Sequence, residues 1–262
     1  MAMTSSKLKQ PDLSIVIPAY HEEHRIGRTL EELASFLKHD GFFAQKEVEV
    51  IVVTADTADR TQEIVAAKQT LFTRFELLKP GPKVGKGRDV QVGMLKATGK
   101  AILYMDADLA TPLHHLEEFY KFYELGTDVI VATRGIRRHG SSKLRIVIST
   151  VGNVLFRLAG GVWIEDSQCG FKMFSAAAAQ QCFTKLKIMG WGFDMEILTI
   201  AKINHLSVKP VRVDDWESVP NGTFERRFIR NNLGALSDLA VIFSRRLRGY
   251  YKSGRTQKGL VT

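Results

Sequence analysis

Apolar and polar residues alternate along the first half of the chain in two rhythms. Short apolar runs at 13–18, 48–54, 75–80, 101–106 and 128–134 predict buried strands. Between these runs, apolar residues recur every three or four positions at 22–39, 59–72, 87–98 and 112–125, which predicts amphipathic helices. Strands that alternate with helices indicate an α/β fold, with a mostly parallel sheet covered by helices on both faces.

The rhythm changes after residue 134. A polar loop is followed by a predicted helix at 144–160 and a short strand at 171–174. A helix at 175–187 opens on Ser175, a residue type favoured at helix N-caps, and a helix at 193–204 and a strand at 207–217 follow. We therefore expect one domain over 13–220, with a regular half at 13–134 and a mixed half at 135–220.

The region 225–250 predicts an amphipathic helix that is also basic. Its apolar residues recur at helical spacing: Ile229, Leu233, Leu236, Ala240, Phe243, Leu247 and Tyr250. Such a helix either packs on the body as the last core helix or lies in a membrane interface and favours anionic lipid. The ends, 1–12 and 251–262, are expected to be disordered.

The charge of the chain belongs to this tail. The net charge is +9, and the residues after 224 hold nine basic side chains against two acidic ones. The charge therefore says little about the body, and no nucleic-acid-binding motif accompanies it, so no nucleic-acid partner is expected. Two cysteines do not make a disulfide framework, and no apolar stretch is long enough to span a bilayer. We expect a cytoplasmic protein, peripheral at the cytoplasmic face of a membrane.

Polar residues gather where the predicted strands end. In an open α/β sheet, ligands sit beyond the carboxyl ends of the strands. The most telling of these ends is "YMDADLATP", in which Asp106 and Asp108 follow an apolar strand. Mg²⁺ and Mn²⁺ prefer carboxylate and phosphate oxygens, so this pair predicts a divalent cation that holds a diphosphate. The alternative is a solvated turn in which an Asp caps the helix that starts near Pro112.

The segment "GPKVGKGRD" lies before the third predicted helix. Lys86 in this segment, together with backbone N–H groups near the helix N-terminus, predicts a phosphate contact. The alternative is an ordinary flexible surface turn. The P-loop pattern is absent.

Five segments in a fixed order resemble a known family. "IVIPAYHEE", "KGRDVQVGML", "YMDADLATP", "VIVATR" and "DSQCGFKMF" are similar to segments of family-2 glycosyltransferases of the GT-A fold. Within that family the chain most resembles the dolichyl (polyprenyl) phosphate glycosyltransferases, in particular the glucosyltransferase branch. The resemblance covers about residues 13–217.

The resemblance implies roles for individual residues. The first half would bind the nucleotide sugar and the second half the acceptor. The residues near the nucleotide sugar would be Pro18, Tyr20, Glu22, Lys86 and Asp106, with Asp106 and Asp108 holding Mg²⁺ or Mn²⁺. The residues that receive the acceptor phosphate would be Arg134, Arg145 and Ser149, and Gln168 would lie near the sugar. Asp108, Arg134, Arg145 and Gln168 would thus surround the reacting groups.

One segment departs from the family pattern. Family members usually carry a pair of aspartates after the second strand, where this chain has Thr54 and Ala55 in "VVTADTAD". Only Asp59 keeps its place, and Asp56 is the candidate substitute one position on. The donor is therefore left open between UDP-glucose and GDP-mannose types.

The expected reaction is an inverting, metal-dependent transfer of a hexose to a polyprenyl or dolichyl monophosphate. A phosphate monoester is mostly a dianion at pH 7, so it needs cationic side chains to hold it and no base to deprotonate it. A hydroxyl acceptor is the alternative, and it would call for a base such as Asp166. A nucleotidyltransferase, which would release pyrophosphate, is a further alternative.

Overall fold

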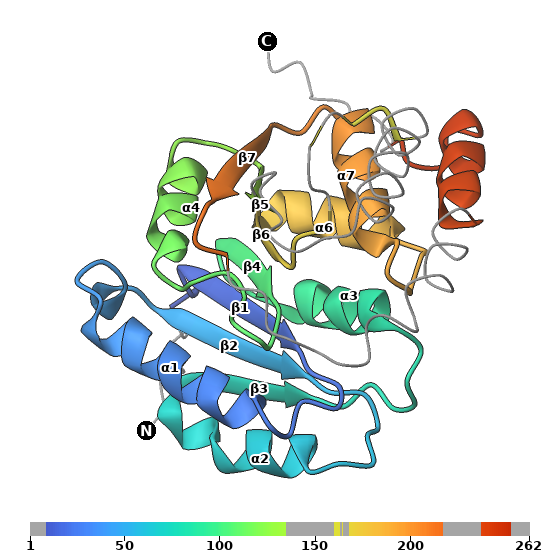
Figure 1. The fold of residues 1–262 in the computed structure, drawn as a ribbon. Helices are drawn as coiled ribbons and strands as arrows, with labels where there is room; N and C mark the ends of the chain where they lie inside the picture. Colours follow the sequence, from blue (N-terminus) through green and yellow to red (C-terminus); the bar gives the residue numbers. More distant parts are fainter. Residues whose placement is uncertain (1–8, 135–159, 163, 165–167, 217–236, 253–262) are drawn as a thin grey trace, which may run out of the picture.

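The computed structural model describes residues 9–134, 160–162, 164, 168–216 and 237–252. These residues form a seven-stranded sheet with the strand order β3-β2-β1-β4-β6-β5-β7 (Figure 1). The strands are β1 (Leu13–Pro18), β2 (Val48–Val53), β3 (Arg74–Leu78), β4 (Ala101–Met105), β5 (Val129–Arg134), β6 (Phe171–Ser175) and β7 (Val208–Val213). Only β6 among them runs antiparallel to its neighbours, β4 and β5. The predicted mostly parallel α/β sheet is confirmed.

Helices cover both faces of the sheet, as predicted. The helices are α1 (Ile26–His39), α2 (Thr61–Ala67), α3 (Lys86–Lys96), α4 (His115–Glu124), α6 (Ala176–Lys185) and α7 (Phe193–Ile203), with short 3-10 turns at Phe43–Gln45 and Gln69–Leu71. Successive residues of β1 face opposite sides. Ile15 and Ile17 join one core with α1, α2 and α4, while Val16 joins the other with α3, α6 and α7.

Several elements begin later than their patterns suggest. The helix expected from 22 begins at Ile26, because residues 22–25 form a turn in which Glu22 O accepts from the N–H groups of Arg25 and Ile26. The helix expected from 112 begins at His115. Ser175 caps α6 as predicted, since its hydroxyl accepts from the N–H of Ala178.

The N-terminal residues that the structure describes are attached to the sheet. Arg74 donates to Lys9 O, and Lys100 Nζ lies 2.8 Å from Oδ1 of Asp12. This part of the expected disordered segment 1–12 is therefore held in place, and residues 1–8 lie outside the described residues.

The C-terminal helix docks on the body through residues that lie off the predicted apolar stripe. Residues 237–247 are helical. Leu239 and Ile242 are buried in the core, whereas Phe243 and Leu247, both on the predicted stripe, are 48% and 72% exposed. The expected stripe therefore faces outward. Its members Ile229, Leu233 and Leu236 lie outside the described residues.

The chain returns to the core after this helix. Tyr251, the first residue of the expected disordered tail, is fully buried, and its hydroxyl donates to Oε1 of Glu196 at 2.7 Å. Arg245, expected on the polar face, pairs with the same oxygen at 3.0 Å. Cys169 and Cys182 are both buried thiols outside any disulfide, in agreement with the expectation of no disulfide framework.

Candidate active site

Most of the residues singled out in the sequence lie at one edge of the sheet, the edge formed by the carboxyl ends of its parallel strands. Because all the described strands except β6 run in the same direction, their carboxyl ends meet at this edge. Pro18 ends β1, Asp106 follows β4 and Arg134 ends β5. The fold thus brings together segments that are more than a hundred residues apart in the chain.

Asp106 and Asp108 lie in the turn that follows β4. The strand ends at Met105, and the Asp106 N–H donates to Gly170 O at 2.9 Å. Ala107 between them is buried, while both carboxylates are partly exposed. Oδ1 of Asp108 accepts from the Ala110 N–H at 3.1 Å. The turn therefore presents two acidic groups on the open side of the sheet edge.

The two carboxylates repel one another. Burial raises the pKa of Asp108, and the neighbouring charge of Asp106 raises it further. A divalent cation between them would reverse this effect, and two carboxylate oxygens are the donor type that Mg²⁺ and Mn²⁺ prefer. The residues present therefore fit such an ion.

Lys86 lies beside this pair. It is the first residue of α3, and its Nζ lies 2.5 Å from Oδ1 of Asp106. Burial alone lowers the pKa of Lys86, but the charges of Asp106, Asp194 and Asp108 outweigh burial and raise it. Lys86 is thus a cation at neutral pH, placed where a diphosphate would need one.

The glycine-rich segment before α3 packs tightly. The Gly87 N–H donates to Met189 O at 2.8 Å, and a Cβ added to Gly87 would lie 2.7 Å from Ile188 O. A Cβ added to Gly85 would overlap Met189 O. These glycines therefore permit a close backbone contact that fixes the start of α3, and the alternative of an ordinary flexible turn is not supported.

The turn after β1 borders the same place. Burial raises the pKa of Glu22, and the charges of Asp108 and Asp106 add to the rise against the opposing effect of Arg25. Tyr20 is partly exposed, and Nζ of Lys83 lies 3.5 Å from the centre of its ring. Glu22 thus lies close enough to the aspartate pair for the negative charge of the pair to raise the pKa of Glu22.

The segment after β2 is where the chain departs from the family pattern. Thr54 and Ala55 are fully buried, and Asp56 is exposed with its N–H bonded to Gly81 O. Asp59 accepts from Thr57 and Thr61 and from the Glu23 N–H, so it joins the start of α2 to the turn after β1. Asp59 therefore has a structural role here, and Asp56 is the exposed acidic side chain of this segment.

The residues expected on the acceptor side are described only in part. The guanidinium of Arg134 lies 4.9 Å from the centre of the Trp216 ring. Gln168 is exposed, in the turn before β6. Arg145, Ser149 and Asp166 lie outside the described residues.

Beneath the aspartate pair is a buried charged network that the sequence analysis missed. Lys172 is fully buried, and its Nζ donates to Cys169 O at 2.6 Å and pairs with Asp194 at 2.5 Å. The hydroxyl of Tyr104 also donates to Asp194. The signal was a lysine inside the apolar run "FKMF" and an aspartate in the first turn of the largely apolar helix "FDMEILTIAKI".

Trp191 is a second residue that the sequence analysis missed. Its side chain is 61% exposed, and Nζ of Lys86 lies 5.1 Å from the centre of its ring. An exposed tryptophan beside a charged site is an apolar surface on which a ligand can stack.

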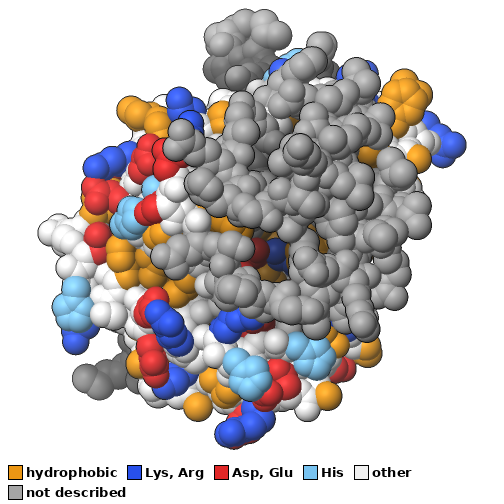
Figure 2. Space-filling model, viewed as in Figure 1, with side chains coloured by type: hydrophobic (Ala, Val, Ile, Leu, Met, Phe, Trp, Pro, Cys, Tyr) orange, Lys and Arg blue, Asp and Glu red, His pale blue; other side chains and the backbone are white. Residues whose placement is uncertain are grey.

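Charges are mixed on the described part of the face that carries this edge. Acidic and basic side chains lie next to one another around its rim, without a broad area of one sign among the coloured residues (Figure 2). No helix within the described residues is long and apolar enough to cross a membrane.

Comparison with known proteins agrees with this geometry. The profile of Glycosyl transferase family 2 matches residues 14–183. A dolichyl-phosphate beta-glucosyltransferase of Trichomonas vaginalis is 32% identical over 216 residues, which are 79% of this chain and 64% of that protein. The enzymes of that name from Drosophila melanogaster and Homo sapiens are each 28% identical, over 94% of this chain and 79% of their own length. The chain thus spans just under two thirds of the Trichomonas relative and about four fifths of the other two.

Solved structures share the fold at low sequence identity. Mannosyl-3-phosphoglycerate synthase from Rubrobacter xylanophilus superposes with a TM-score of 0.65 at 15% identity, over 95% of this chain and 78% of that one. Glucosyl-3-phosphoglycerate synthase from Mycobacterium tuberculosis, solved with Mn²⁺ and UDP-glucose, superposes with a TM-score of 0.59 at 17% identity, over 88% and 80%. At this identity the likeness concerns the fold alone.

Proposed function

Because the chain belongs to glycosyltransferase family 2, we propose that it transfers a hexose from a nucleotide sugar to a polyprenyl or dolichyl monophosphate. The observation that carries the proposal is the grouping of Lys86, Asp106 and Asp108 at the carboxyl edge of the sheet. The names of the relatives supply the acceptor. The enzyme class follows from the family, and the residue roles below are our assignment.

The first half of the domain, 13–134, binds the donor in this proposal. Asp106 and Asp108 would hold a Mg²⁺ or Mn²⁺ ion, which would supply positive charge against the diphosphate of the leaving group. Lys86 adds a positive charge beside Asp106. Pro18, Tyr20, Glu22 and Asp56 border the nucleoside, since Pro18 ends β1 and the others follow β1 and β2 at the same edge. The donor that we favour is UDP-glucose, because the relatives are glucosyltransferases by name.

The second half, 135–220, receives the acceptor. The oxygen of a phosphate dianion attacks the anomeric carbon directly, so the configuration at that carbon inverts and no proton has to be removed. The side chains must instead hold one anion against another. Arg134 supplies a planar cation for this purpose, and its contact with Trp216 orients the guanidinium. Arg145 and Ser149 complete the acceptor side, and Gln168 lies near the sugar.

The C-terminal helix brings the enzyme to the membrane that carries the lipid. Its outward face includes Phe243 and Leu247, which are 48% and 72% exposed, and Tyr250, 46% exposed, follows in the turn after the helix. Arg248 and Lys252 are exposed near the end of this face, and Figure 2 shows hydrophobic side chains beside basic ones at the upper right, where Figure 1 places the helix. Apolar side chains flanked by cations suit the interface of an anionic bilayer. This arrangement supports a peripheral enzyme at the cytoplasmic face.

The test compares two acceptors that differ only in the phosphate. Labelled hexose from UDP-glucose is offered to dolichyl phosphate and to the matching alcohol, dolichol, with Mg²⁺ or Mn²⁺, and the lipid fraction is extracted. We expect label in the lipid fraction with the phosphate alone. Label in dolichol would reject the phosphate acceptor. The absence of label in both lipids would reject it as well.

A further inference from the structure

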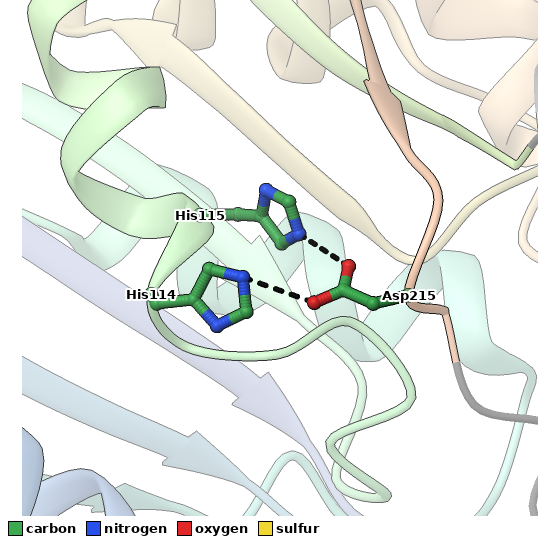
Figure 3. A group of neighbouring side chains, drawn as sticks. All are labelled: His114, His115 and Asp215. Atoms are coloured by element: carbon green, nitrogen blue, oxygen red, sulfur yellow. Dashed lines mark hydrogen bonds and ion pairs between the residues drawn. The ribbon is translucent and has the colours of Figure 1, made fainter.

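A second group of metal-binding side-chain types lies on the same edge of the sheet, beside its outermost strand. His114 and His115 stand at the start of α4, and Asp215 follows β7 (Figure 3). Nε2 of His115 lies 2.6 Å from Oδ1 of Asp215, and Nε2 of His114 lies 3.0 Å from Oδ2. One candidate ligand atom from each residue lies within 4.8 Å of the other two. Segments a hundred residues apart therefore bring three ligand atoms to one point.

The ligand types differ from those of the aspartate pair. Two imidazole nitrogens and a carboxylate oxygen suit Zn²⁺, Co²⁺ or Ni²⁺, whereas Asp106 and Asp108 offer oxygen alone. Bonds of about 2.0–2.2 Å to a tetrahedral metal separate its ligands by roughly 3.3 Å. The two histidine–aspartate distances would have to widen slightly, and ligand atoms that lie up to 4.8 Å apart would have to come closer. The side chains of His114 and Asp215 are 63% and 49% exposed, so they have room for these shifts.

His115 is oriented for such a role. Its side chain is only 14% exposed, and its other ring nitrogen, Nδ1, lies 3.9 Å from Oε2 of Glu118. A carboxylate on the far side of a ligand histidine fixes the ring and leaves Nε2 free to bind a metal. Glu118 lies one helical turn along α4, where a small rotation of its side chain brings it into hydrogen-bond range.

The position of the group indicates what a bound metal would do. The loop from β4 to α4 begins with Asp106 and Asp108 and ends at His114 and His115. β7 is separated from β4 by β6 and β5 in the sheet. A metal held by both histidines and Asp215 would fasten the far end of this loop to β7, next to Trp216.

We propose that His114, His115 and Asp215 bind a transition metal of the zinc type, which anchors the loop that carries the aspartate pair. The evidence for this site does not depend on the proposed glycosyl transfer. An ion pair between protonated histidines and Asp215 would explain the same distances without a metal, and the experiment separates the two.

The test uses the full chain, freed of metals with a chelator and titrated with Co²⁺ in the absence of nucleotide. We expect the visible absorption of nitrogen-ligated cobalt to saturate near one equivalent. The double variant Asp106→Asn/Asp108→Asn should show the same titration, because it alters only the other site. His114→Ala, which removes an exposed ligand, should weaken binding on the order of tenfold or more. His24→Ala, at a 91% exposed histidine beside Glu23, should change nothing.

A second measurement guards against misfolding of the variant. Zn²⁺ should raise the melting temperature of the wild type more than that of His114→Ala, while both proteins have the same circular dichroism without metal. Absence of saturable binding would overturn the proposal. So would cobalt binding that is lost in the aspartate double variant and kept in His114→Ala.

Discussion

The carboxylate of Asp106 occupies the space that a side chain at residue 170 would fill, and Gly170 has none. A Cβ built on Gly170 would overlap the carboxyl carbon and both oxygens of Asp106. The two backbones also meet, since the Asp106 N–H donates to Gly170 O. The "QCG" turn and the aspartate pair are therefore fitted to one another, and the buried network of Lys172 and Asp194 holds this turn through Cys169 O.

The first prediction concerns this contact. Gly170→Ala should displace the Asp106 carboxylate by about an ångström and lower the rate of transfer roughly a hundredfold, because catalysis depends on exact placement. The measurement is kcat/KM beside circular dichroism. Gly41→Ala is the control, since a Cβ at Gly41 meets nothing within 4 Å. Full activity of Gly170→Ala would show that Asp106 is not part of the site.

The second prediction separates donor from acceptor. Arg134→Ala should leave the affinity for the nucleotide sugar unchanged and lower transfer to the lipid phosphate roughly ten- to hundredfold, because it removes a charged hydrogen-bond donor to the acceptor. The two quantities come from calorimetry and from initial rates. Arg212→Ala, at a 66% exposed arginine on β7, is the matched control. Loss of donor affinity in Arg134→Ala would show that the acceptor assignment is incorrect.

The third prediction is a pH dependence of stability at Asp59. Burial raises the pKa of Asp59, but hydrogen bonds from Thr57, Thr61 and the Glu23 N–H outweigh burial and lower it to about 2. Because the folded-state pKa lies below the unfolded value of 3.8, the stabilisation is present above about pH 4 and is lost as the pH falls towards 2. Asp59→Asn should therefore cost about 1–2 kcal/mol at pH 7 and less at about pH 3.

Urea unfolding at the two pH values measures this difference. The control is Asp56→Asn, since the side chain of Asp56 is exposed and should affect the free energy of unfolding little at either pH. An Asp59→Asn effect that is the same at both pH values would contradict the assignment.

The fourth prediction concerns the end of the C-terminal segment. Tyr251→Phe should lower the free energy of unfolding by about 1–3 kcal/mol, because it removes a hydrogen bond to the buried carboxylate of Glu196. Its neighbour gives a matched control. Tyr250 is 46% exposed, so Tyr250→Phe should be close to neutral. Equal effects of the two substitutions would mean that Tyr251 does not belong to the core.

The fifth prediction concerns the outward face of the same helix. Phe243→Ser/Leu247→Ser should weaken binding to anionic liposomes at least tenfold and leave the melting temperature nearly unchanged, because both side chains are exposed. Leu125→Ser is the control, since Leu125 is 81% exposed at the end of α4. Sedimentation with vesicles gives the bound fraction. Unchanged binding of the double variant would reject the membrane contact.

The sequence predicted what depends on local pattern. Periodicity predicted the strands, and residue type predicted the capped start of α6 at Ser175. The common direction of parallel strands predicted that Asp106 and Lys86 meet at one edge. Periodicity could not decide which face of the C-terminal helix docks. Leu239 and Ile242 have helical spacing as well as Phe243 and Leu247, and only the tertiary contacts distinguish the two sets.

The sequence also could not predict which distant residues form ion pairs with one another. Nothing in the local pattern joins Lys172 to Asp194, or His115 to Asp215. Each pair forms because the sheet brings the ends of its strands and helices together. An unusual polar residue in an apolar run shows that a partner must exist, but it does not show which one.

Release of nucleoside diphosphate tests the central claim most directly. UDP-glucose and GDP-mannose are compared with Mg²⁺ or Mn²⁺, each with and without a polyprenyl phosphate, for the wild type and Asp108→Asn. We predict release from UDP-glucose that requires both the lipid phosphate and Asp108. Equal release with and without the lipid phosphate would contradict the account, and so would the absence of lipid-stimulated release from both donors. Either result would make Asp166 the residue to test as a base.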